Sequence, residues 1–158
     1  MNNFSYFTDT KIEYELAMKR LSILEERKME IWQRYFGVKS PRWDKIGAQG
    51  SRDDSDKMVR YLEEINRSTG KSLSLEQEIA KIRNEADRLE KVLKEMTKRL
   101  RKTDTIEGKM YYLIVVERQS VSKAIKHLSE TEFMSEKNLW KTYYPKIKED
   151  VRKLRKKD

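Results

Sequence analysis

The chain has 158 residues, of which 37% are apolar and 40% charged, and its formal net charge is +9. This composition excludes a deep globular core, and with five glycines and two prolines it favours long helices that each bury one stripe. The positive charge favours a polyanionic partner, such as nucleic acid or an anionic membrane surface.

The sequence gives no reason to expect a targeting segment or cysteine chemistry. The start, MNNFSYFTDT, has no cationic segment and no long apolar run, so we expect no signal peptide. No run of about 18 apolar residues occurs, so we expect no membrane span. The lack of cysteine excludes disulfides and suits a reducing compartment. We therefore expect a cytoplasmic protein without a membrane partner.

The first predicted helix covers residues 11–36. Thr10 with Glu13 fits a capping box, and Gly37 is a plausible stop. Residues 37–54 hold three of the five glycines and indicate a linker. Its GAQG resembles the GxxG loop of KH domains, but no flanking strands are visible, so we prefer a hinge. Trp43 is expected to pack on a neighbouring helix.

Two further helices are predicted before residue 103. Ser55 caps a helix over residues 56–66, with Met58, Val59, Leu62 and Ile65 directed inward. Ser74 and Gln77 form a capping box before a helix with a 3.5-residue apolar repeat, which is typical of a coiled coil. Its seam consists of Leu75, Ile79, Ile82, Ala86, Leu89, Leu93, Met96 and Leu100. Another helix must cover this seam, either from the same chain or from a second copy.

The C-terminal third contains three short predicted helices. The first covers residues 106–117, and the second, capped by Ser120, covers residues 121–130. The third is capped by Ser135 and is expected to stop at Pro145. Phe133 and Met134 are expected to fill the space between the last two helices, and a tail helix would dock through Ile147, Val151 and Leu154. This spacing is typical of a DNA-binding helix-turn-helix unit.

A set of polar side chains is placed to contact DNA. If Leu139 and Tyr143 face inward, with Trp140 partly buried, then Lys137, Asn138 and Lys141 face the major groove, where asparagine can pair with adenine and lysine with guanine. Residues 107–158 carry thirteen Lys and Arg against eight Asp and Glu. The expected phosphate and base contacts are Ser120, Ser122, Lys123, Lys126, Ser135, Lys137, Asn138 and Lys141.

Catalytic chemistry finds no support in the sequence. His127 is the single histidine, and we expect it on the outer side of a helix. No second histidine or cysteine supplies a metal site, and no nucleophile–base pair is evident. We therefore expect no enzyme, no metal and no cofactor.

In its architecture, most of the chain resembles phage-encoded transcriptional regulators of the RinA and ArpU kind. The resemblance rests on the order of segments: SPRWDKIGAQGS, SDKMVRYLEEI, the heptad helix, VERQSVSKAIKHLS and MSEKNLWKTYYPKI. It implies a C-terminal helix-turn-helix similar to the promoter-reading region of sigma factors. It also implies a role in phage or prophage gene control, with RNA polymerase as a further candidate partner.

The sequence thus predicts an all-α protein with N-terminal helices, a long heptad helix and a C-terminal helix-turn-helix unit. We expect residues 1–102 to form a helical pairing region, with a homo-oligomer formed through the heptad helix, and residues 103–158 to form a helix-turn-helix domain that binds double-stranded DNA. Two alternatives remain open: a helical protein-interaction adaptor, and a phage DNA-packaging recognition subunit that forms large rings.

Overall fold

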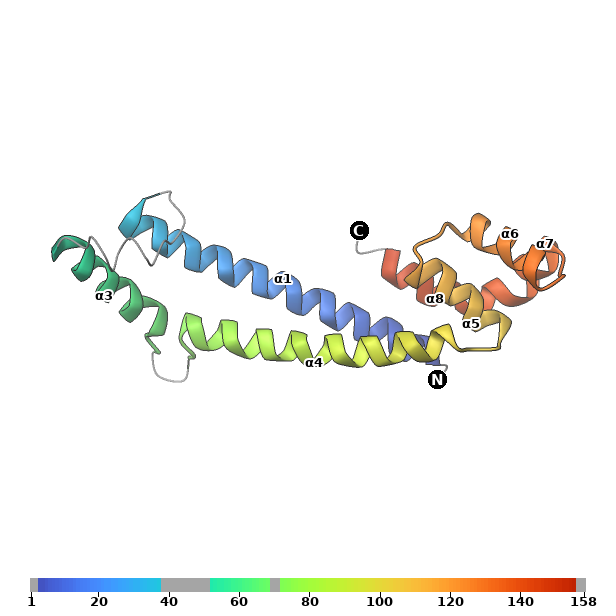
Figure 1. Ribbon diagram of the computed structural model, residues 1–158, viewed down its shortest axis with the longest axis horizontal. Helices are drawn as coiled ribbons and strands as arrows, with labels where there is room; N and C mark the ends of the chain where they lie inside the picture. Colours follow the sequence, from blue (N-terminus) through green and yellow to red (C-terminus); the bar gives the residue numbers. More distant parts are fainter. Residues whose placement is uncertain (1–2, 38–51, 69–71, 156–158) are drawn as a thin grey trace. The chain divides into compact units, whose positions relative to one another are not determined.

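The structure is a computed structural model that describes residues 3–37, 52–68 and 72–155. The described residues form helices joined by turns and contain no strand, which confirms the all-α class (Figure 1). The regular helices are α1 (Asn3–Phe36), α3 (Arg52–Asn66), α4 (Leu75–Arg101), α5 (Ile106–Tyr111), α6 (Val121–Thr131), α7 (Glu136–Asn138) and α8 (Tyr144–Arg155). Two wide π-helical turns, η1 (Tyr112–Val116) and η2 (Leu139–Tyr143), continue α5 and α7.

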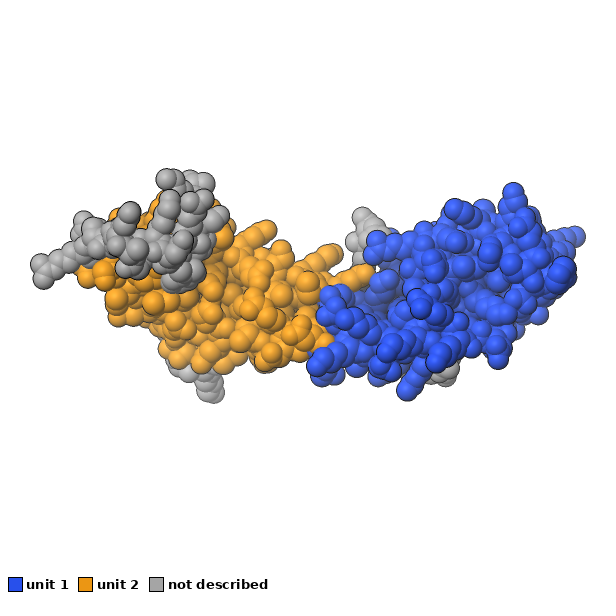
Figure 2. Space-filling view, in the orientation of Figure 1, with its two compact units in different colours: residues 1–14, 88–158 blue, residues 15–87 orange. Residues whose placement is uncertain are grey.

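The chain divides into two compact units (Figure 2). Unit 1 contains residues 1–14 and 88–158, and unit 2 contains residues 15–87. Both divisions fall inside long helices, since α1 contains residue 14 and α4 contains residue 88. The sequence predicts a domain boundary between residues 102 and 103. The two compact units are groups of residues that contact one another, so that boundary stays a prediction. The predicted linker at 37–54, with GAQG and Trp43, lies mostly outside the described residues.

Helix α1 begins at Asn3 rather than at residue 11, so the predicted capping box of Thr10 and Glu13 is wrong. Thr10 lies inside the helix, where its Oγ1 donates to the Tyr6 carbonyl oxygen at 2.8 Å. A threonine hydroxyl can bond to the carbonyl four residues earlier within a helix as well as cap one. The predicted end is confirmed, because Gly37 has φ +83° and donates its N–H to the Gln33 carbonyl.

Helix α4 confirms the predicted heptad pattern. The Ser74–Gln77 capping box forms, with Gln77 N–H donating to Ser74 Oγ at 3.2 Å and Ser74 N–H donating to Gln77 Oε1 at 3.0 Å. All eight seam residues are buried or half-buried within this single chain. Other helices of the same chain therefore cover this seam, and the expected pairing between chains stays a prediction.

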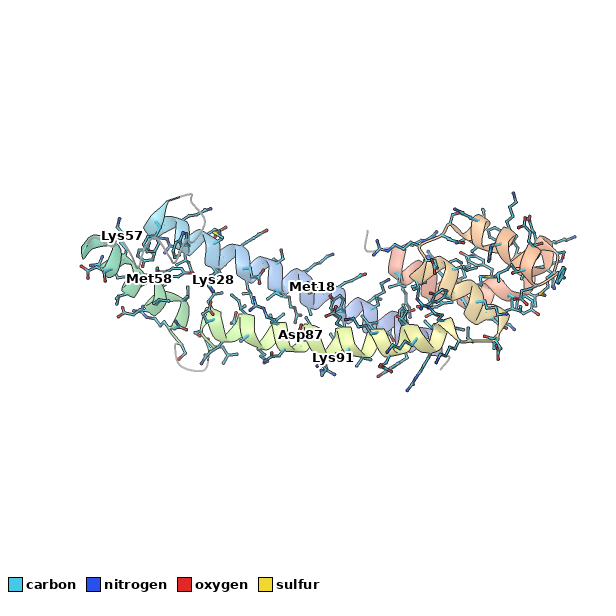
Figure 3. The ribbon with its side chains drawn as sticks, in the orientation of Figure 1. Met18, Lys28, Lys57, Met58, Asp87 and Lys91 are labelled. Atoms are coloured by element: carbon cyan, nitrogen blue, oxygen red, sulfur yellow. The ribbon has the colours of Figure 1, made fainter. Side chains whose placement is uncertain are left out.

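In unit 2, ion pairs and an aromatic cluster join α1 to its neighbours. Glu25 of α1 pairs with Arg83 of α4 at 2.8 Å. Lys28, labelled in Figure 3, pairs with Glu76 near the start of α4. As α1 advances from Glu25 to Lys28 its partner on α4 moves back from Arg83 to Glu76, so the two helices run antiparallel here. Burial of Ile31, Trp32, Tyr61 and Ile65 holds α3 against α1.

Helix α3 differs from the prediction in its start and in its buried face. It begins at Arg52, so Ser55 lies inside the helix and does not cap it. Tyr61 and Ile65 are buried, whereas Val59 and Leu62 are 52% and 39% exposed. The helix turns Tyr61 toward Trp32, whose ring centroid lies 5.0 Å away, and Val59 and Leu62 are thereby carried outward. A large aromatic ring thus sets the buried side of this helix.

Unit 1 combines the start of α1 with the end of α4 and the C-terminal helices. Phe7 and Leu100 share a buried cluster with residues of α5, α6, η2 and α8. Thr8 Oγ1 lies 2.6 Å from the buried Tyr111 hydroxyl, and Ser5 Oγ donates to Asp150 of α8 at 3.2 Å. Burial raises the pKa of the Tyr111 phenol, which keeps it protonated for this hydrogen bond. These contacts hold the first residues of the chain on the C-terminal helices.

Candidate nucleic-acid interface

The two helices of the predicted DNA-binding unit begin where the sequence places them. Ser120 caps α6, since its Oγ accepts from the Lys123 N–H at 3.2 Å. Ser135 caps α7 in the same way, accepting from the Asn138 N–H at 3.1 Å. Only residues 132–135 separate α6 from α7. A turn of four residues between capped helices is the connection that a helix-turn-helix requires.

The turn holds Phe133 in an unusual conformation. Phe133 has φ +55°, in the left-handed region, and its side chain is 94% exposed. The predicted plug between the helices is therefore wrong for Phe133, because the reversal of the chain after α6 directs this ring to solvent. Met134 is half-buried and fills part of that space. Its carbonyl accepts from Ser129 Oγ at 2.6 Å, which ties the turn to α6.

The helix that begins at Glu136 does not stop at Pro145. Residues 136–155 are helical without a break, through α7, η2 and α8. The wide turn η2 ends two residues before the proline, and the Tyr144 N–H donates to the Leu139 carbonyl five residues earlier. Pro145 has no N–H to donate, and such a wide turn changes the hydrogen-bond pattern just where that donor is missing. The prediction of a short separate helix is therefore wrong.

The buried and exposed sides of this helix follow the predicted phase. Leu139 is fully buried and Tyr143 half-buried, whereas Lys137 and Lys141 are exposed. At about 100° per residue, Lys137 and Lys141 each point roughly 160° away from Leu139. The predicted docking of the last helix is also confirmed, since Ile147 and Val151 are buried and Leu154 is half-buried.

Asn138 is exposed beside the two lysines, and its side chain is already engaged. Its Oδ1 accepts from Thr142 Oγ1 at 2.9 Å. An amide oxygen has two lone pairs, so Asn138 can still accept from a second donor while its NH2 group donates. Glu136 is exposed in the same first turn, where a carboxylate stabilises the helix start and could accept from cytosine.

Helix α6 presents polar side chains on its outer side. Ser122, Lys123 and Lys126 are exposed, as is His127, whereas Ala124, Ile125 and Leu128 are buried. In the described part of the chain, no carboxylate pairs with any of the exposed lysines of α6 and α7–η2. These lysines are Lys123, Lys126, Lys137 and Lys141. Their charges are therefore available to an external anion.

An aromatic pair, Trp140 and Tyr144, also lies in the candidate interface, and the sequence analysis did not predict it. Trp140 is 42% exposed, and its ring centroid lies 5.3 Å from that of Tyr144 at 72°. The spacing of four residues along a helix was a usable signal for this pair. Trp140 lies between Lys137 and Lys141 along the chain, so an apolar surface adjoins their charges.

Metal binding and membrane insertion have no support in the described residues. They hold no group of three or more His, Cys, Asp or Glu side chains that could bind a metal ion. Among the described helices, none has both the length and the apolar character required to cross a bilayer. Comparisons with models of known protein families, with curated proteins and with solved structures gave no match to this chain.

Proposed function

We propose that this protein binds double-stranded DNA through the outer side of α6 and of the helix formed by α7 and η2. The observation that carries the proposal is the exposed pair Lys137 and Lys141, opposite the buried Leu139, on a capped helix that follows α6 after a four-residue turn. Helix-turn-helix proteins place the side chains of such a second helix in the major groove.

The exposed residues divide into two roles under this proposal. Lys137, Asn138 and Lys141 contact base edges, with Trp140 beside them as an apolar surface for a thymine methyl group. Ser120, Ser122, Lys123, Lys126 and Ser135 contact phosphates and position the protein without reading sequence. The resemblance to phage regulators supports a role in transcription control in the cytoplasm, with RNA polymerase as a partner.

Selection of bound fragments from the genome that encodes the protein tests this proposal. We expect the native chain to enrich a short common sequence. Replacement of Lys137 and Lys141 by glutamine should abolish the enrichment. A matched variant with Lys81→Gln and Lys91→Gln has the same net charge, and both of its lysines are exposed on α4. Lys91 is labelled in Figure 3. If the native chain enriches nothing, or both variants behave alike, the proposal is wrong.

A protein-interaction adaptor is the second candidate, and exposed apolar side chains in unit 2 favour it. Leu16 and Ile23 of α1 are 43% and 64% exposed, and their spacing of seven residues places them on one side of the helix. The heptad seam is covered within the chain. We therefore expect a homo-oligomer to form through exposed apolar side chains such as Leu16 and Ile23 and not through the seam. Sedimentation of the native chain and of Ile23→Lys distinguishes a monomer, a dimer that the substitution breaks, and the large ring of a packaging subunit.

A further inference from the structure

Unit 1 contains a cleft that the proposed DNA contacts do not use. Its volume is about 810 Å³, within the range of roughly 300–1,000 Å³ that is usual for small-molecule sites. Residues from the start of α1, the end of α4, the turn before α5, and α8 line it. The lining residues are Phe4, Tyr6, Phe7, Met96, Arg99, Leu100, Thr103, Thr105, Glu107 and Lys146.

The apolar part of the cleft is held in place by packing against the core. The Phe4 and Phe7 rings lie 5.0 and 5.9 Å from the Tyr111 ring, and Tyr111 is fully buried. Leu100 is 8% exposed, and Met96 packs against the same cluster. These side chains form a fixed apolar surface that suits a flat hydrocarbon or aromatic group.

The polar part of the cleft includes two neighbouring threonines. Thr103 Oγ1 lies 3.2 Å from Thr105 Oγ1. Gly108 allows this approach, because a Cβ at position 108 would lie 2.5 Å from Thr103 Cγ2 and 2.7 Å from Thr105 Oγ1. Two hydroxyl groups thus adjoin the apolar surface. One of them donates to the other, and the remaining hydroxyl proton can donate a hydrogen bond to an anion.

Three charged side chains line the cleft, and two of them pair with each other. Glu107 accepts from Lys146 Nζ at 2.9 Å, so these two charges compensate each other. The Arg99 side chain is exposed and makes no ion pair or hydrogen bond with another described residue. The lining therefore has an excess of one positive charge beside an apolar surface.

We propose that this cleft binds a small amphipathic monoanion, with a flat apolar body against Phe4, Phe7 and Leu100. Its carboxylate or sulfonate group pairs with the Arg99 guanidinium. Because none of the proposed DNA contacts lines the cleft, this binding is independent of the proposed function.

A pair of fluorescent compounds tests the proposal directly. One is 8-anilinonaphthalene-1-sulfonate, and the other is N-phenyl-1-naphthylamine, which has the same aromatic body without the charge. Both are titrated into the full chain labelled with 13C at the methionine methyl groups. We expect the Met96 methyl signal to shift and to saturate at one equivalent. The signals of Met29 and Met58 in unit 2 should stay in place.

Two glutamine variants separate the charge contact from general hydrophobic binding. Arg99→Gln should weaken the sulfonate about tenfold and change the affinity for the neutral compound less than twofold. Arg88→Gln removes the same charge from α4 outside the cleft and should change neither affinity. The unshifted Met29 and Met58 signals report that unit 2 of each variant remains folded, and an unchanged signal of the fully buried Met110 reports the same of unit 1. An unshifted Met96 signal, equal losses for both compounds in Arg99→Gln, or shifts at all three methionines would overturn the proposal.

Discussion

In the turn between α6 and α7, we expect substitution by glycine to stabilise the fold, although glycine usually destabilises it. Phe133 has φ +55° and is 94% exposed, so its ring contributes little packing to unit 1. The left-handed conformation costs an ordinary residue about 1–2 kcal/mol, and glycine avoids this cost. Glycine also gives the unfolded chain more freedom, which offsets about 0.5–1 kcal/mol. We therefore expect Phe133→Gly to raise the free energy of unfolding by about 0.5–1 kcal/mol.

Urea unfolding at equilibrium measures this difference, as a midpoint higher by a few tenths molar at an unchanged slope. Phe133→Ala is the matched control, because alanine removes the ring but keeps the Cβ that makes the conformation costly. Alanine should therefore give no gain over the native chain. If Phe133→Gly is less stable than Phe133→Ala, the exposed ring or the backbone conformation of this turn has been misassigned.

Three further substitutions test other parts of the structure. Leu89→Lys places a charge where the native side chain is 3% exposed. We expect the free energy of unfolding, measured by thermal unfolding, to fall by at least about 3 kcal/mol, and the molar mass at native conditions to stay unchanged. A folded chain of altered molar mass would contradict the burial of the seam within one chain. The hydrogen bond from Lys146 lowers the pKa of Glu107 below 4.5, so it stabilises the fold above that pH and the contribution is lost as the pH falls through the lowered value. Urea unfolding of Glu107→Gln should therefore differ from the native chain at pH 6 and converge with it near pH 3, and a constant difference would count against the pair. Trp140→Ala should weaken duplex binding about five- to tenfold at unchanged thermal stability, and a large stability loss would show that the ring is structural.

Local signals in the sequence predicted much of the fold correctly. The heptad of α4 and its Ser74–Gln77 cap are confirmed because both depend on residues close together in the chain. The Ser120 and Ser135 caps are confirmed for the same reason. The run LIVV at 113–116 is locally strand-like, yet it lies wholly within the π-helical turn η1, because burial of Ile114 and Val115 in the unit 1 cluster outweighs local propensity.

Contacts between distant parts of the chain could not be predicted from local patterns in the sequence. The contacts of Ser5 with Asp150 and of Thr8 with Tyr111 each span more than a hundred residues, so no local period announces them. At Pro145 the pattern favoured a helix end, but the wide turn at η2 let the helix continue. In the candidate interface the phase of Lys137 and Lys141 was predictable from Leu139. Trp140 was expected to be partly buried, and it is 42% exposed. Its ring contact with Tyr144 was not predicted.

The proposed function requires the exposed lysines of α6 and of the helix that begins at Glu136 to bind duplex DNA. The most direct test is the salt dependence of binding to a duplex of about 20 base pairs, for the native chain and for the variant with Lys123→Gln and Lys126→Gln, which removes two of the proposed phosphate contacts. Each phosphate contact contributes about −0.9 to the slope of log K against log salt concentration. We expect the double variant to bind more weakly, with a slope shallower by about one to two units, whereas Lys81→Gln with Lys91→Gln keeps the native slope. An absence of duplex binding by the native chain at low salt, or one common slope for all three proteins, would contradict the claim.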